Sequence, residues 1–186
     1  TKPELMGNIV EKASKYAFPL YTVNPIHPSI DFAYGYDPKK YEPNKPRRAD
    51  LNCTSLKNLM FEIDGIPLDD QLELLFRSGI PWTAIVFSGN KSYHAILSLE
   101  DNLGEPHTQE GVEQYKQVWK RLAALINAEY AGKIVSLNEG VLDEATKNPS
   151  RFSRFPNYMR QGHLQRIEFM GSKCSMATLN KILEKC

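Results

Sequence analysis

Residues 82–99 read WTAIVFSGNKSYHAILSL. The apolar run from Trp82 to Phe87 predicts a buried strand, Ser88 to Lys91 predicts a turn, and Tyr93 to Leu99 predicts a second strand. Two strands joined by so short a turn form a hairpin, in which they pair antiparallel. The hairpin therefore argues against a sheet made only of parallel strands that alternate with helices.

Strand and helix patterns flank this hairpin on both sides. Residues 59–64 alternate, which predicts a strand with positions 59, 61 and 63 on one face and Met60, Glu62 and Asp64 on the other. Asp69 is expected to cap a helix that ends at Gly79. The inner face of that helix is expected to carry Leu72, Leu75 and Phe76.

After the hairpin, the spacing predicts a long helix over residues 112–130, a strand over 163–170 and a last helix capped by Ser175. The buried face of the long helix is expected at steps of three and four, namely at Val112, Tyr115, Trp119, Leu122, Ile126 and Tyr130. Helices and strands mixed in this order, with at least one hairpin, predict the α+β fold class.

The N-terminal part, residues 1–57, differs from the rest of the chain. Residues 5–17 have helical spacing, whereas residues 18–57 hold six prolines and a basic group, Lys39, Lys40, Lys45, Arg47 and Arg48. We expect one domain over residues 1–186, with its α/β core in 58–186. Because the chain starts at Thr1 and stops at Cys186 within a helical pattern, we expect a fragment of a longer protein.

The overall composition excludes several classes of protein. The 23 basic and 22 acidic side chains give a net charge of +1, which argues against a protein that coats nucleic acid through bulk charge. Three scattered cysteines are too few for a disulfide scaffold or a four-ligand zinc site, so a reducing compartment is the simpler interpretation. The apolar runs are too short to cross a bilayer, so no membrane partner is expected.

Glu62 and Asp64 form the first candidate for chemistry. Two carboxylates two residues apart on a strand point the same way, with their backbones roughly 7 Å apart. Both can then reach one pair of Mg²⁺ or Mn²⁺ ions, which require hard oxygen ligands. The alternative is an acidic pair that faces solvent on an edge strand.

Lys91, Ser92 and His94 form the second candidate. The glycine-containing turn exposes backbone N–H groups, and Lys91 adds a charge suited to phosphate. Ser92 and His94 fall on the same face of the outgoing strand. The alternative is an ordinary hairpin turn with a histidine whose hydrogen bonds are satisfied within the fold.

Asp143 and the arginines that follow it form the third candidate. Asp143 comes after two apolar residues and can end a strand near Glu62 and Asp64. Arg151 and Arg154 interleave with two phenylalanines, a pattern that can hold guanidinium groups near a triphosphate or a template. The alternative is a loop with surface arginines and buried aromatic residues.

Taken in order, these motifs resemble those of the archaeo-eukaryotic primase superfamily, which includes the primase-polymerases. The first family motif, an acid, any residue and an acid, is similar to Glu62-Ile63-Asp64, although many members have Asp first. The second, serine, any residue and histidine, is similar to Ser92-Tyr93-His94, and the third, an apolar residue and an acid, to Leu142-Asp143. Residues 59–157 carry the resemblance, and the run from Asn148 to Pro156 looks most like phage and plasmid primases.

The resemblance implies a core of two α/β modules, one with a sheet like that of an RNA-recognition motif, and an active site between them. It implies that Glu62, Asp64 and Asp143 bind Mg²⁺ or Mn²⁺, with Glu144 as the alternative third ligand. It also implies that His94 contacts the phosphates of the incoming nucleotide, and that Lys91, Ser92, Arg151 and Arg154 assist this binding.

The expected activity is template-directed nucleotidyl transfer by a DNA primase or primase-polymerase. Its partners would be nucleoside triphosphates and a single-stranded DNA template, with a helicase or other replication domain elsewhere in the full-length protein. The setting would be cytoplasmic, in bacterial, archaeal, phage or plasmid replication. Two alternatives stay open: an inactive primase-like module that binds nucleic acid, and a metal-dependent nuclease with the same acids.

Overall fold

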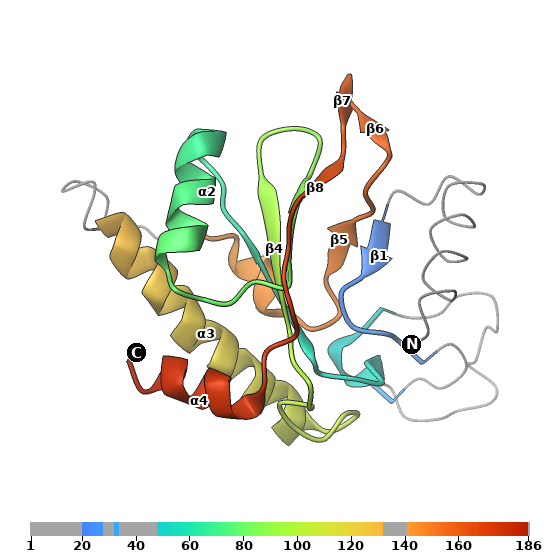
Figure 1. Cartoon of the computed structure of the whole chain (residues 1–186). Coiled ribbons are helices and arrows are strands. Elements are labelled where there is room, and N and C mark those ends of the chain that lie inside the picture. The colour runs from blue at the N-terminus through green and yellow to red at the C-terminus, as the bar shows by residue number, and fades with distance from the viewer. Residues whose placement is uncertain (1–19, 28–31, 34–47, 132–140, 186) are drawn as a thin grey trace, which may run out of the picture.

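A four-stranded antiparallel sheet forms the centre of the molecule in this computed structural model, which describes residues 20–27, 32–33, 48–131 and 141–185 (Figure 1). The strands are β2 (Asn58–Glu62), β3 (Ala84–Phe87), β4 (Tyr93–Ser98) and β8 (Arg166–Met170), in the order β2-β4-β3-β8. Strands β3 and β4 pair antiparallel, so the predicted hairpin is confirmed. The predicted helix at 5–17 and the basic residues Lys39, Lys40, Lys45 and Arg47 lie outside the described residues.

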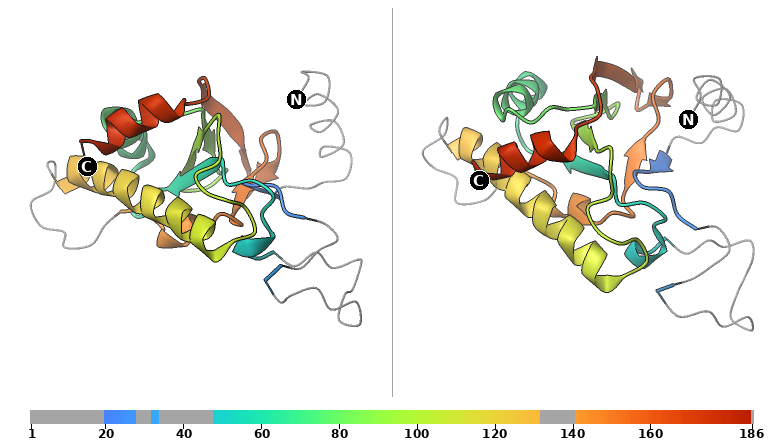
Figure 2. Two further views of the ribbon diagram at one scale, coloured as in Figure 1. Left: turned by 90° about the horizontal axis from the view of Figure 1, so that it is seen from below. Right: turned by 60° about the horizontal axis from the view of Figure 1, so that its bottom comes forward.

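Helices cover one face of this sheet. They are α2 (Leu68–Arg77), α3 (Gln109–Ala131) and α4 (Met176–Leu183) (Figures 1 and 2). The main core lies between them and the sheet, where Phe61 of β2 stacks on Trp119 of α3 with ring centroids 5.3 Å apart. All six positions predicted for the inner face of the long helix are buried. The α+β fold class is therefore confirmed.

The opposite face is covered by a short two-stranded ribbon. Strand β1 (Leu20–Thr22) pairs antiparallel with β5 (Phe152–Arg154), and a small cluster of Val23, Met60 and Ile96 packs beneath it. Met60 is therefore fully buried, because β2 has a hydrophobic contact on both of its faces. Arg48, the described member of the N-terminal basic group, lies over the Phe152 ring at 4.8 Å.

The outer edge of β2 is closed by α3 and by a later segment. The carbonyls of Asn58, Met60 and Glu62 point away from β4 at alternate positions. Tyr115 Oη donates to the first at 2.7 Å and Trp119 Nε1 to the second at 2.8 Å. The Glu62 carbonyl accepts from the backbone N–H of residue 143 at 2.9 Å. All three edge carbonyls thus have a partner within the chain.

Two details of the helix after β2 correct the expectation from sequence. Asp69 is not its N-cap: Pro67 holds that position, no side chain caps the helix, and Asp69 lies in the first turn. Phe76 is not on the buried face, because it is 51% exposed and contacts Phe169 of β8 edge-on. Gln71 is buried on the inner face together with Leu74 and Leu75. Because Gln71 is polar, the helical spacing of apolar residues does not reveal this face in the sequence.

Other boundaries shift by a few residues. The first hairpin strand begins at Ala84 instead of Trp82, and the segment 163–170 forms two strands, β7 (His163–Leu164) and β8. Strand β7 pairs with β6 (Met159–Arg160) in a small hairpin. Ser175 caps α4 as expected, with its Oγ accepting from Thr178 N–H. Short 3-10 turns occur at η1 (Asp50–Asn52) and η2 (Glu144–Lys147). No helix in the described part of the chain is long and apolar enough to span a membrane.

Candidate active site

The chain brings the three predicted carboxylates to one end of β2. Beyond Glu62, the strand continues as a single antiparallel bridge between Ile63 and Leu142. Asp64 N–H donates to the Val141 carbonyl at 3.0 Å, and Asp143 N–H donates to the Glu62 carbonyl at 2.9 Å. Asp143 therefore lies opposite Glu62, and residues opposite each other in an antiparallel pair share a face. Asp64 shares that face because it is two residues from Glu62.

Glu62 is the most enclosed of these acids, with its side chain 17% exposed. Its Oε1 accepts from Ser92 Oγ at 2.7 Å and lies 3.5 Å from His94 Nε2. Burial alone would raise the pKa of Glu62, but hydrogen bonds from His94 and Ser92 and the positive charge of Arg151 outweigh burial and lower it to about 2. Glu62 is thus held as a fixed negative charge.

His94 connects the sheet to the ribbon on its other side. It is 4% exposed, and its Nδ1 lies 3.0 Å from Ser153 Oγ of β5, while Nε2 faces Glu62. Ser153 is fully buried and also hydrogen-bonds Tyr21 of β1. Both ring nitrogens of His94 therefore have partners, as the satisfied-histidine alternative expected. Ser153 was not predicted as a site residue. The signal in the sequence that could have suggested it is its position between Arg151 and Arg154.

Asp64 and Lys91 meet at the more open side of the site. Lys91 Nζ lies 3.0 Å from Asp64 Oδ1, and the two side chains are 68% and 40% exposed. This contact is an ion pair without hydrogen-bond geometry, since Asp64 Oδ1 is shielded from solvent and has no hydrogen-bond partner among the described residues. An ion pair this exposed contributes only about 0–1 kcal/mol, so Lys91 can be displaced easily.

Asp143 is held from two sides. Its Oδ1 accepts from Ala145 N–H at 2.9 Å, which caps η2, and its Oδ2 pairs with Arg151 Nη2 at 2.9 Å. Glu144, the alternative third acid, is 78% exposed and pairs with Lys147, which lowers the pKa of Glu144. The backbone register thus places Asp143, and not Glu144, opposite Glu62.

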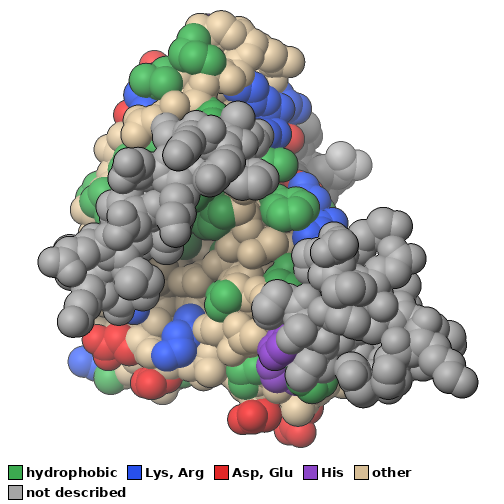
Figure 3. Space-filling model, turned by 90° about the vertical axis from the view of Figure 1, so that its right-hand side faces the viewer, with side chains coloured by type: hydrophobic (Ala, Val, Ile, Leu, Met, Phe, Trp, Pro, Cys, Tyr) green, Lys and Arg blue, Asp and Glu red, His purple; other side chains and the backbone are tan. Residues whose placement is uncertain are grey.

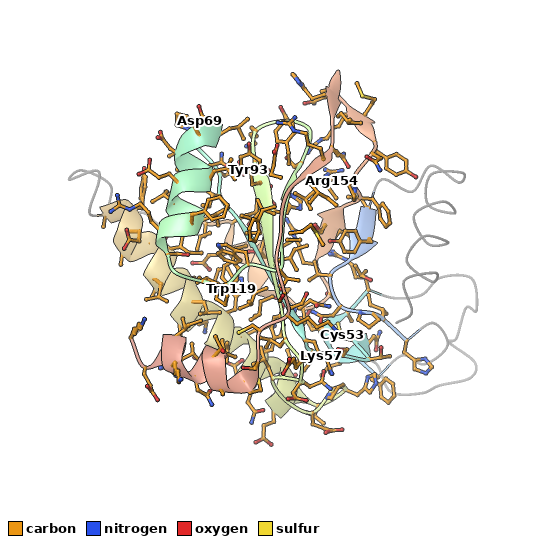
Figure 4. The ribbon with its side chains drawn as sticks, viewed as in Figure 1. Cys53, Lys57, Asp69, Tyr93, Trp119 and Arg154 are labelled. Carbon is orange, nitrogen blue, oxygen red and sulfur yellow. The ribbon has the colours of Figure 1, made fainter. Side chains whose placement is uncertain are left out.

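Arg154 has a different environment from Arg151. Burial and the nearby charge of Arg160 lower the pKa of Arg154, and Glu62 partly opposes them. Arg160 in turn donates to the Ser88 carbonyl at 3.3 Å. Figure 4 shows Arg154 at the upper end of β5, on the side of the sheet away from the helices, and Figure 3 shows several Lys and Arg side chains close together in the upper part of this side. The two positive charges of Arg154 and Arg160 outweigh the negative charge of Glu62, so this place attracts an anion.

The turn that carries Lys91 packs tightly on the β6–β7 hairpin. Gly89 has a φ of +78°, and a Cβ there would lie 2.9 Å from Gln165 Cγ and 3.0 Å from Arg160 Cβ. Glycine is therefore needed both for its conformation and for the close approach. Ser88 and Ser92 close the turn through their hydroxyls, 3.0 Å apart.

The three acids have the oxygen ligands that a divalent ion needs, but they do not form a preorganised metal site. Glu62, Asp64 and Asp143 supply hard oxygens. Asp64 Oδ1 accepts no hydrogen bond and lies 3.0 Å from the Lys91 ammonium, which a metal ion would displace. In the part of the chain that the structure describes, no three His, Cys, Asp or Glu side chains already stand close enough to hold a metal. Asp143 would have to release Arg151 to join the other two.

Comparison with known proteins identifies a solved structure with a similar fold. No family model matches the sequence, and no curated protein matches it. Among solved structures, the chain is similar to the archaeo-eukaryotic primase (AEP) domain of the cyanophage S-2L primase-polymerase, with a TM-score of 0.54 at 21% identity. The match covers 73% of this chain and 64% of that one, which is less than two thirds of its length. This likeness shows that the chain has the fold of that domain.

Proposed function

We propose that this chain is the catalytic domain of a DNA primase or primase-polymerase, which joins nucleoside triphosphates on a single-stranded DNA template. One observation carries the proposal: the backbone register places Glu62, Asp64 and Asp143 on one face, next to Lys91 and Arg154. Nucleotidyl transfer needs acids for divalent ions and cations for the triphosphate in one place. The fold shared with the cyanophage domain supports the same activity.

The residues divide the work by charge. Glu62, Asp64 and Asp143 would hold two Mg²⁺ or Mn²⁺ ions, which when bound activate a 3′-hydroxyl and stabilise the departing pyrophosphate. Lys91 exchanges Asp64 for a phosphate oxygen of the incoming nucleotide, since its present ion pair is weak. Arg154 neutralises the triphosphate together with Arg160.

His94 and Ser92 support Glu62 in this scheme. Both contact the same Glu62 oxygen and so fix the direction of the carboxylate. For His94 to contact a phosphate directly, its Nδ1 would have to give up Ser153, which is fully buried on β5. Arg151 now pairs with Asp143 and would have to release that carboxylate for it to hold an ion, which would free the guanidinium for the negative charges of the triphosphate.

The decisive experiment is nucleotide incorporation on circular single-stranded DNA, with and without a primer, in Mg²⁺ or Mn²⁺. Replacing Asp64 with Asn should abolish synthesis while leaving the fold intact, because Asp64 is a surface carboxylate with no structural hydrogen bond at Oδ1. Asp101→Asn is the matched control, since Asp101 is exposed just beyond the other end of β4. Normal synthesis by the Asp64 variant would remove the metal assignment.

Incorporation, together with binding and cleavage of the same circular DNA and titration with nucleotide, separates the two alternatives. An inactive module should bind DNA but show neither synthesis nor metal-dependent nucleotide binding in the unaltered chain. A nuclease should cut the circular DNA and ignore free nucleotides. Either result would replace the polymerase proposal.

A further inference from the structure

The loop after Asp64 and the turn that carries Lys91 both end on one buried side chain. Gln71 lies on α2 and is fully buried. Its Nε2 donates to the Ile66 carbonyl at 2.9 Å and to the Lys91 carbonyl at 2.8 Å, and its Oε1 accepts from Tyr93 N–H at 3.1 Å. Both amide hydrogens and the amide oxygen are therefore used.

These contacts tie together two segments that are far apart in sequence. Ile66 follows Asp64 by two residues, whereas Lys91 and Tyr93 flank the start of β4. The ion pair between Asp64 and Lys91 is too exposed to hold the two segments in place by itself. The bonds from the Gln71 side chain start from a fully buried amide, where a hydrogen bond has less competition from solvent.

An amide at this position is not explained by packing. The neighbouring inner positions of α2 are Leu74 and Leu75, which bury apolar side chains in the main core. Burying a polar amide is costly unless all of its groups are paired, and an apolar residue would fill the same space without that requirement. What the amide supplies, and an apolar side chain cannot, is the link to the two loops.

We infer that Gln71 is a positioning residue, which sets the spacing between Asp64 and Lys91 and hence between the metal-binding acids and the triphosphate. The inference rests on the proposed function for its catalytic meaning, although the link between the loops exists without it. Because Gln71 is fully buried, it would act through the two loops and not by direct contact with nucleotide or metal. Its loss should therefore move Asp64 and Lys91 relative to each other and weaken the binding of metal and nucleotide. Misplacement by about 1 Å can also cost up to roughly a hundredfold in rate.

The test compares Gln71→Met, which keeps the length but removes the amide, with Leu75→Val on the same helix. Leu75 is fully buried, and its side chain has no hydrogen bond to lose. Incorporation assays would give the nucleotide KM and the half-saturating Mn²⁺ concentration. Hydrogen exchange would report on the Tyr93 amide, which Gln71 binds directly.

Gln71→Met should raise the nucleotide KM and the Mn²⁺ requirement by about tenfold or more beyond the control, and should speed exchange at Tyr93. Equal shifts in both variants would mean that Gln71 is merely structural and would overturn the inference. If Gln71→Met fails to fold, Gln71→Glu replaces it, since it keeps the acceptor for Tyr93 but sets oxygens against the Ile66 and Lys91 carbonyls. A normal KM and Mn²⁺ requirement in that variant would overturn the inference as well.

The outcome stays separate from that of the proposed function. If the unaltered chain incorporates no nucleotide, the polymerase proposal fails and the exchange comparison alone decides. Faster exchange at Tyr93 in Gln71→Met then supports the link between Gln71 and the start of β4, and unchanged exchange refutes it. If neither variant folds, hydrogen exchange of the unaltered protein decides. A Tyr93 amide that exchanges as slowly as the amides in the middle of β4 supports the link, and a Tyr93 amide that exchanges rapidly overturns it.

Discussion

Replacing Gly89 with Ala should loosen the turn that carries Lys91, and its cost can be divided into two parts. The first is conformational, because the φ of +78° is unfavourable for any residue with a Cβ and costs about 1–2 kcal/mol. The second is steric, because the new Cβ would lie 2.9 Å from Gln165 Cγ and 3.0 Å from Arg160 Cβ. Forcing such contacts typically costs about 1–3 kcal/mol. The total free energy of unfolding should fall by about 2–5 kcal/mol.

Gly162→Ala is the matched control. Gly162 has a φ of +83°, and a Cβ there would have nothing within 4 Å, so only the conformational cost remains. Any gain from a stiffer unfolded chain is common to both variants and cancels in the comparison. Urea unfolding should therefore place Gly89→Ala below Gly162→Ala by about 1–3 kcal/mol. The nucleotide KM should also rise only for Gly89→Ala. Equal losses of stability would refute the close packing of the turn on the β6–β7 hairpin.

Two other pairs of substitutions test the site and its support. Arg154→Ala should raise the nucleotide KM, because losing a charged contact weakens nucleotide binding by about 1.5–3 kcal/mol. Arg151→Ala should instead change mainly the Mn²⁺ requirement, because Arg151 holds Asp143. Identical effects of the two in titrations of nucleotide and Mn²⁺ would contradict these roles. Trp119→Phe should destabilise the fold by at least about 1–3 kcal/mol, because it removes the donor from a buried carbonyl of β2. Tyr115→Phe should cost only about 0.5–1.5 kcal/mol in the same urea titration, since Asn24 also donates to that carbonyl, and the reverse order would refute the explanation.

Local patterns were sufficient for the elements that form the sheet and its helices. The alternation over 59–64, the hairpin at 82–99 and the spacing of the long helix each depend on neighbours within a few residues, and the structure has all three. The fold class followed from them. Helix starts were less predictable: Asp69 is a good capping residue, but Pro67 ahead of it fixes where the helix begins.

Parts of the site that depend on distant contacts could not be predicted. The sequence places Asp143 after two apolar residues, but not its pairing with Arg151 or its register opposite Glu62. Gln71 looks like a surface residue on a helix until the carbonyls of two remote loops are brought to it. Ser153 gains its place in the site through contacts with Tyr21 and with His94, which lies 59 residues away in sequence. Each of these depends on tertiary structure and leaves no periodic signal.

The closed outer edge of β2 also determines where this sheet can grow. An added strand needs free N–H and C=O groups, and the outward carbonyls of Asn58, Met60 and Glu62 are already bound within the chain. Of the two edges of this four-stranded sheet, that leaves β8, which pairs only with β3 within it. A second copy or a peptide that extended the sheet would therefore add along Arg166–Met170, three strands away from the strand that carries Glu62. Association through the sheet would leave the acids uncovered, so such an assembly could still bind substrate.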